Sequence, residues 1–128
     1  MKSLNKKQIL ERVAEEAKRD KHVAAVLLFG SHAGKRASKN SDIDICLLFS
    51  DRNTASGREL EFSSISDAVD VSDFYSLPIY IRKRILKDGK VLFCRNERLL
   101  YDASLKTIKE YRHYGRHYNY YLRRIANG

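Results

Sequence analysis

The pattern of apolar and polar positions divides the first part of the chain into one helix and three strands. Apolar residues recur at helical spacing after Asn5, a favoured N-cap residue, and the pattern ends at Asp20. This predicts an amphipathic helix. The segments 23–29 and 43–49 are apolar at nearly every position, which is typical of strands buried on both faces of a sheet. A third strand is expected over 69–74.

The rest of the chain is mainly helical in pattern. A weak helical pattern covers 58–65. A clearer one begins at Pro78, a residue that suits the first turn of a helix, and stops at Gly89. A short strand over 91–94 and a long helix over 97–125 follow. Helices that alternate with buried strands in this order predict an α/β or α+β fold around a small sheet.

The length and composition fit one globular domain. The chain has 128 residues, of which 43% are apolar and 32% charged. We therefore expect a single domain over 1–128, in which 97–126 forms a C-terminal helical extension. The longest apolar run, 23–29, is too short to cross a membrane, and the first residues lack the apolar segment of a secretory signal. A cytoplasmic protein that does not bind a membrane is expected.

One segment between the two buried strands carries candidate chemistry. The first of these strands ends in Gly30-Ser31, and ten residues later Asp42-x-Asp44 begins the next. Side chains at i and i+2 of a strand lie on the same side, so the two carboxylates project together. Adjacent carboxylates repel each other, and a divalent cation relieves that repulsion. Hard oxygen ligands favour Mg²⁺, with Mn²⁺ as the alternative.

The same segment has features that suit a phosphate. Gly30 allows the backbone to approach a ligand closely, and Ser31 offers a small hydroxyl. Positive charge in the connection comes from Lys35, Arg36 and Lys39, and the formal net charge of the whole chain is +9. A metal site beside a phosphate site is typical of a nucleoside triphosphate pocket. An ordinary turn or an ordinary cap explains either feature alone, but not their conjunction at this spacing.

The combination of Gly-Ser, ten residues and Asp-x-Asp resembles the signature of the DNA polymerase β-like nucleotidyltransferase superfamily. The chain's size and its form Ser-Asp-Ile-Asp over 41–44 look like the minimal nucleotidyltransferases of that superfamily. The resemblance implies a nucleotidyltransferase fold, with a small mixed sheet flanked by helices and a long C-terminal helix. It further implies that Asp42 and Asp44 hold two Mg²⁺ ions, and that Gly30 and Ser31 hold the phosphates of ATP.

In this superfamily a third acid on a later strand completes the metal site and can accept the nucleophile's proton. The candidates are Asp67, Asp70 and Asp73. Asp67 looks like a turn residue. Asp70 lies between two valines inside the expected strand, and Asp73 has the opposite strand parity, so only one of them should face the pocket. Parity and the resemblance favour Asp70, and the choice between Asp70 and Asp73 stays open.

The acceptor of the nucleotide is not evident from the residues. The resemblance implies transfer of AMP from ATP to a protein hydroxyl, namely a tyrosine of a HEPN toxin, with this chain as the antitoxin. Two alternatives are an antitoxin that acts by binding alone and a transferase that acts on an RNA end, which salt-dependent RNA binding would reveal. Self-association stays open, and nucleic acid ranks below a protein as partner.

The C-terminal segment 101–128 has an unusual composition. It holds six of the eight tyrosines, six basic residues and two acidic residues. Its apolar positions follow helical spacing at Leu105, Ile108, Tyr111, Tyr118, Leu122 and Ile125. One interpretation is that this stripe packs on the sheet. The other is a partly exposed partner surface, because Tyr and Arg are enriched in interfaces.

Overall fold

The computed structural model describes residues 4–30, 42–51 and 57–127, with the backbone alone for 117–122 and 125–127. The chain forms helices and strands in the order α1 (Lys6–Arg19), β1 (Val23–Phe29), β2 (Ile43–Phe49), α2 (Arg58–Ser63), β3 (Val69–Asp73), η3 (Phe74–Ser76), α3 (Ile79–Asp88), β4 (Lys90–Cys94) and α4 (Glu97–Asn127). Every helix and strand expected within the described residues is present.

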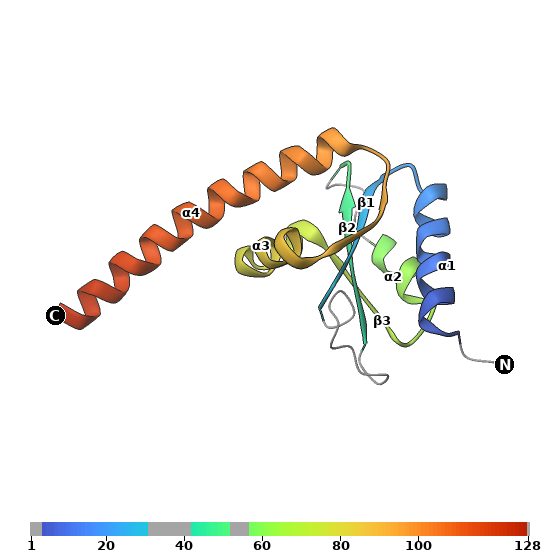
Figure 1. The fold of residues 1–128 in the computed structure, drawn as a ribbon, viewed down its shortest axis with the longest axis horizontal. Coiled ribbons are helices and arrows are strands. Elements are labelled where there is room, and N and C mark those ends of the chain that lie inside the picture. Colours follow the sequence, from blue (N-terminus) through green and yellow to red (C-terminus); the bar gives the residue numbers. More distant parts are fainter. Residues whose placement is uncertain (1–3, 31–41, 52–56, 128) are drawn as a thin grey trace.

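The four strands form one mixed sheet in the order β3-β2-β1-β4. β1 runs antiparallel to both β2 and β4, whereas β2 and β3 are parallel. Helices α1 and α2 cover one face of the sheet, and α3 and the first turns of α4 cover the other (Figure 1). The expected fold class, a small mixed sheet flanked by helices with a long C-terminal helix, is confirmed.

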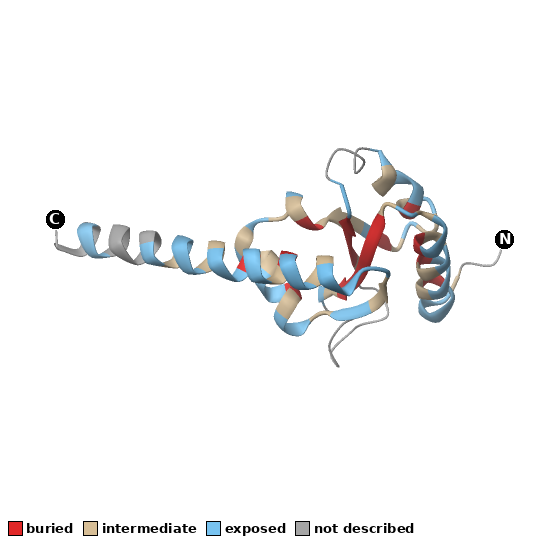
Figure 2. Ribbon diagram, turned by 90° about the horizontal axis from the view of Figure 1, so that it is seen from above, coloured by how far each residue is buried: buried red, intermediate tan, exposed pale blue. Residues whose placement is uncertain are grey.

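Burial on both faces explains the apolar character of the two central strands. Ile43, Ile45, Leu47 and Phe49 pack in one core cluster with α1 and α2. Cys46 and Leu48, between them in the sequence, pack in a second cluster with α3 and α4. Figure 2 shows the buried residues concentrated in the sheet and the helix faces against it. Each face of β2 thus packs against its own hydrophobic layer. An acidic residue within such a strand is unfavourable, so its presence there calls for a functional explanation.

Local chemistry fixes the ends of several elements. Asn5 caps α1 through a reciprocal pair of hydrogen bonds with Gln8, as expected for a helix start. The strand expected over 69–74 ends instead at Asp73, because the Asp73 carboxylate accepts a hydrogen bond from the backbone of Tyr75 and begins η3. Pro78 is the N-cap of α3 and not part of its first turn. The short helix considered for 31–41 lies outside the described residues.

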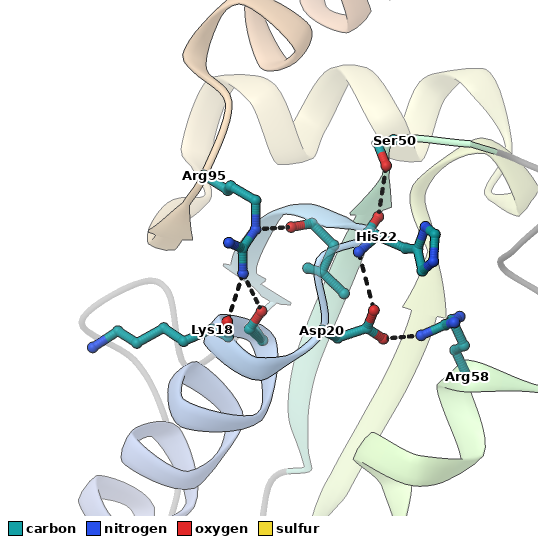
Figure 3. Close-up of polar contacts among 8 residues, drawn as sticks. Lys18, Asp20, His22, Ser50, Arg58 and Arg95 are labelled. Atoms are coloured by element: carbon teal, nitrogen blue, oxygen red, sulfur yellow. Dashed lines mark hydrogen bonds and ion pairs between the residues drawn. The ribbon is translucent and has the colours of Figure 1, made fainter.

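Arg95, directly after β4, ties three parts of the fold together (Figure 3). Its guanidinium donates to the backbone oxygens of Ala17 and Lys18 at the end of α1, at 3.0 and 2.7 Å, and to the Val23 oxygen at the start of β1, at 3.3 Å. Carbonyls at a helix C-terminus lack partners within the helix and carry partial negative charge. A cation therefore stabilises the end of α1 and holds it against the sheet.

Replacing Arg95 by Met is expected to lower the free energy of unfolding by about 1–3 kcal/mol, because hydrogen bonds from a charged donor to helix-end carbonyls are lost. Urea unfolding followed by circular dichroism measures this change. Arg98→Met is the matched control, because Arg98 is 83% exposed and pairs only with exposed Asp102. It is expected to cost less than about 0.5 kcal/mol. Equal losses in the two variants would contradict the role given to Arg95.

The structure bears on the C-terminal stripe at its first two positions, Leu105 and Ile108. Leu105 and Ile108 are 40% and 41% exposed, whereas Ala103 and Thr107 are buried against the body of the protein. The apolar stripe therefore does not pack on the sheet at these positions, because the small residues Ala103 and Thr107 let α4 approach closely on its other side. Among the described residues, no helix is long and apolar enough to span a membrane.

Candidate functional site

Asp42 and Asp44 lie at the beginning of β2. Asp44 is half-buried and Asp42, directly before the strand, is exposed. Alternation along β2 places Asp44 on the face of Cys46 and Leu48, which α3 and α4 cover, because Ile43 and Ile45 occupy the other face. Asp42 shares that parity. The predicted projection of the pair toward one side of the sheet thus agrees with the observed strand.

Asp70 joins this pair through the pairing of β3 with β2. The two strands are parallel, and their register places Asp70 directly beside Asp44. Val69 and Val71 pack into the core on the α1 side, so Asp70 lies on the opposite side, with Asp44. Paired residues on neighbouring strands have Cβ atoms about 5 Å apart. Two acidic residues therefore lie side by side on one sheet face, and Asp42 follows on the same strand.

Asp73 occupies a different place in the fold. It pairs with Leu47, three positions further along β3, about 10 Å from Asp70 along the strand. Its carboxylate accepts hydrogen bonds from the Tyr75 backbone at 3.2 Å and from the Ser76 hydroxyl at 3.3 Å. Burial, and secondarily the charge of Asp73, raises the pKa of Glu59 on α2. Asp73 thus ends β3 and caps η3, away from Asp44.

Gly30 ends β1 beside Asp44. Its φ of +73° is in the left-handed region, which side chains other than glycine adopt at a cost. A Cβ on Gly30 would lie 2.2 Å from Oδ2 of Asp44 and 3.1 Å from its Cγ. The Asp44 carboxylate therefore occupies the space that a side chain at position 30 would need. Gly30 therefore both allows the turn after β1 and leaves room for the Asp44 carboxylate.

The remaining phosphate-binding candidates fall on the connection between β1 and β2. Ser31, Lys35, Arg36 and Lys39 all lie outside the described residues. One cation outside the sequence-based candidates lies near this end of β1. Lys90, exposed at the start of β4, pairs with Leu28, which packs on the α1 face, so the pairing places Lys90 on the face opposite Asp44. The antiparallel pairing of β4 with β1 decides this position, and no local pattern in the sequence signals it.

The chemistry of these donors fits a hard divalent cation. Within residues 4–30, 42–51 and 57–127, no three His, Cys, Asp or Glu side chains already converge on one metal position. The three carboxylates nevertheless share one face and one end of the sheet, and Gly30 leaves the space in which the Asp44 carboxylate lies. Carboxylate oxygens without nitrogen or sulfur donors suit Mg²⁺ or Mn²⁺. Cys46 is no competing ligand, because burial keeps its thiol protonated by raising its pKa.

Paired carboxylates beside a glycine turn, at one end of a mixed sheet, define an enzyme of the nucleotidyl-transfer class. The family model described as polymerase beta, nucleotidyltransferase matches residues 11–98, which include all four strands and the three carboxylates. The chain belongs to this nucleotidyltransferase family. The family that the motif predicted is confirmed.

A relative in Methanocaldococcus jannaschii shares part of the sequence. This protein, MJ1547, carries a provisional name as a protein adenylyltransferase, and it is 43% identical to the chain over 72 residues. The matched region makes up 56% of each protein. The match therefore spans little more than half of the length of that relative.

Several solved structures share the fold over nearly the whole chain. A chain of a toxin–antitoxin complex with AMP-PNP has a TM-score of 0.69 and 22% identity, covering 94% of this chain and 98% of that one. A chain of the MntA–HepT toxin–antitoxin complex has a TM-score of 0.65 and 23% identity, with 92% and 97% covered. A third belongs to a complex of tri-AMPylated Shewanella oneidensis HEPN toxin with MNT antitoxin, at TM-score 0.62 and 21% identity, with 91% and 92% covered. At these identities the likeness concerns the fold.

Proposed function

We propose that the chain transfers AMP from ATP, with Mg²⁺, to a tyrosine hydroxyl of a HEPN-domain toxin and so acts as its antitoxin. The observation that carries the proposal is the placement of Asp44 beside Asp70 and against Gly30, on the face that Asp42 shares. The name of the M. jannaschii relative and the HEPN toxins in the complexes of similar fold support a protein acceptor.

Each residue has a distinct part in the proposed reaction. Asp42, Asp44 and Asp70 would hold the Mg²⁺ ions, and Asp70 would also accept the proton of the attacking hydroxyl. Gly30 and Ser31 would bind the β- and γ-phosphates, with Lys35, Arg36 and Lys39 as further cationic contacts. When bound, Mg²⁺ supplies charge stabilisation for the attacking and leaving oxygens. The bond from the acceptor oxygen to the α-phosphorus forms, the bond to the β-phosphate breaks, and pyrophosphate leaves.

The test is the intact mass of a purified HEPN-domain protein before and after reaction with this chain. The two proteins are incubated with ATP and Mg²⁺, and the modified residue is located by peptide sequencing. A gain of one or more AMP groups on tyrosine is expected, with loss of the gain in EDTA and its return on adding Mg²⁺. A stable complex without any gain would favour an antitoxin that acts by binding alone. A gain on RNA and not on protein would favour the RNA-end transferase.

The third carboxylate is tested by comparing Asp70→Asn with Asp73→Asn. We expect Asp70→Asn to lower the rate of AMP transfer at least about 100-fold with little effect on stability, because Asp70 is exposed and lies beside Asp44. Asp73→Asn is expected to keep the rate within about threefold and to change the free energy of unfolding by less than about 0.5 kcal/mol, since the asparagine Oδ1 can accept the same hydrogen bond from the Tyr75 backbone and caps η3 about as well. The reverse pattern would assign the role to Asp73.

A further inference from the structure

The outward face of α4 carries a stripe of exposed apolar side chains. Tyr101, Leu105 and Ile108 recur at helical spacing, so they lie on one face of the helix. They are 57%, 40% and 41% exposed. Single exposed apolar residues are ordinary, whereas a row of three on a helix that already has a buried side is a candidate contact surface.

The opposite face of α4 anchors the helix to the body of the protein. Ala103 and Thr107 are buried there. Further along, Glu110 accepts from Arg82 of α3 at 3.2 Å. The ammonium of Lys83, also on α3, lies 4.2 Å from the centre of the Tyr111 ring. The body therefore already holds this inward face, and the outward stripe is the side that remains open to a second molecule.

Beyond Tyr111 the helix projects away from the body (Figures 1 and 2). Arg112 and Arg116 are exposed on this part of the helix. Most of the stability of a helix in a protein comes from tertiary packing of its faces. The projecting part of α4 therefore gains stability when a partner packs along it. The projecting part of α4, like the apolar stripe, therefore favours a partner molecule that packs along the helix.

The charge of α4 indicates what kind of partner fits. The sequence contains no acidic residue after Glu110. The outward face continues from the apolar stripe through Arg112, Arg116 and Arg123, which recur at helical spacing and are exposed. A second copy of this chain in the same orientation would bring like charges together, which is unfavourable. A protein with an apolar strip flanked by acidic side chains is complementary to this face.

We propose that the outward face of α4, from Tyr101 to Arg123, is the docking surface for the protein acceptor of this enzyme, and that the acceptor meets it with an acidic and apolar surface. α4 packs on the sheet face on which Asp44 and Asp70 lie. A protein held along α4 is therefore on the same side of the sheet as the acidic residues. Its identity as the acceptor rests on the proposed function, whereas its docking on α4 does not.

The experiment measures binding of the same HEPN-domain protein to the full chain by isothermal titration calorimetry. Leu105→Glu/Ile108→Glu and Arg112→Glu/Arg116→Glu change the apolar and the basic parts of the outward face. Each double variant is expected to weaken binding at least about 30-fold. Leu60→Glu is the apolar control, because Leu60 is 73% exposed on α2, on the other side of the sheet. It is expected to bind within about twofold of the unchanged chain.

A charge control and a structural control accompany these variants. Lys7→Glu/Arg12→Glu makes the same change in charge on α1, where both residues are exposed, and is expected to change binding less than about threefold at 0.15 M salt. Circular dichroism and unfolding temperature verify that every variant keeps its fold. Since Leu105 and Ile108 are partly exposed and Glu is a good helix former, folded variants are expected.

The outcomes separate docking from catalysis. Loss of binding in the α4 variants alone supports the docking surface, even if the unchanged chain transfers no AMP and the proposed function fails. Unchanged binding in both α4 variants overturns the docking surface, even if AMP transfer is observed. Dimerisation of the chain through this face also overturns the docking surface. The same holds if Arg112→Glu/Arg116→Glu weakens binding of a labelled single-stranded RNA but does not weaken binding of the HEPN-domain protein.

Discussion

Replacing Asp42 and Asp44 together by Asn is expected to lower the rate of AMP transfer at least about 1,000-fold, or about 4 kcal/mol in activation free energy. The neutral amides keep the size of the side chains but remove the negative charge that binds a divalent cation. Asp42 is exposed, and Asp44 loses repulsion from Asp70 beside it. The unfolding temperature is therefore expected to stay the same or to rise. Intact-mass kinetics and thermal unfolding measure the two effects.

The matched control is Glu11→Gln/Glu15→Gln, which removes two negative charges from exposed positions on α1, on the other face of the sheet. It is expected to keep the transfer rate within about twofold, because screened surface charges act weakly at this distance. A double variant at Asp42 and Asp44 that keeps more than a tenth of the normal rate would contradict the assignment of these two residues as metal ligands. A control variant that loses activity equally would show that net charge, and not ligation, sets the rate.

Gly30→Ala is expected to lower the transfer rate at least about 10-fold and to lower the free energy of unfolding by about 1–3 kcal/mol. The backbone strain comes from the positive φ of position 30. The loss of activity comes from the new Cβ, which would overlap the Asp44 carboxylate at 2.2 Å and push it from its place. Mn²⁺ titration without ATP checks this directly, because the affinity then depends on the carboxylates.

Gly57→Ala is the control that introduces backbone strain without displacing a carboxylate. Gly57 also has a positive φ, of +82°, but a Cβ there would meet no atom of the described residues within 4 Å. It is expected to cost about 1 kcal/mol in stability and to leave the transfer rate within about twofold. If Gly30→Ala behaved like Gly57→Ala in both activity and Mn²⁺ affinity, the contact between Gly30 and Asp44 would have no functional part.

The two large predicted effects and the docking surface concern different steps of one reaction. In the proposed reaction the carboxylates and Gly30 would act where the nucleotide reacts, at the meeting point of β1, β2 and β3. The outward face of α4 would act earlier, by holding the acceptor on that side of the sheet. A variant of α4 that transfers AMP normally at saturating partner concentration, but poorly at low concentration, would fit this division.

The sequence by itself determined the elements, the family and the candidate residues for the chemistry. Unbroken apolar runs identified β1 and β2, because a strand covered on both faces has no polar side. Asn5 identified the start of α1 because its side chain can satisfy a free backbone N–H. The Gly-Ser and Asp-x-Asp motifs were visible because both lie within short stretches of chain, where spacing alone fixes geometry.

Only the tertiary structure decided which distant residues meet. The parallel pairing of β3 with β2 places Asp70 beside Asp44, whereas Asp73 lies at the end of β3 and caps η3. Strand parity in the sequence could show only that Asp70 and Asp73 point to opposite faces of the sheet. The pairing of β4 with β1 places Lys90 beside Leu28, on the face opposite Asp44. Which side of α4 is buried depends on how closely α3 and the sheet approach the helix. Helical spacing in the sequence shows that residues share a face, but it does not show which face is buried. Pairing and packing across the sheet are properties of the whole chain, so local patterns do not carry them.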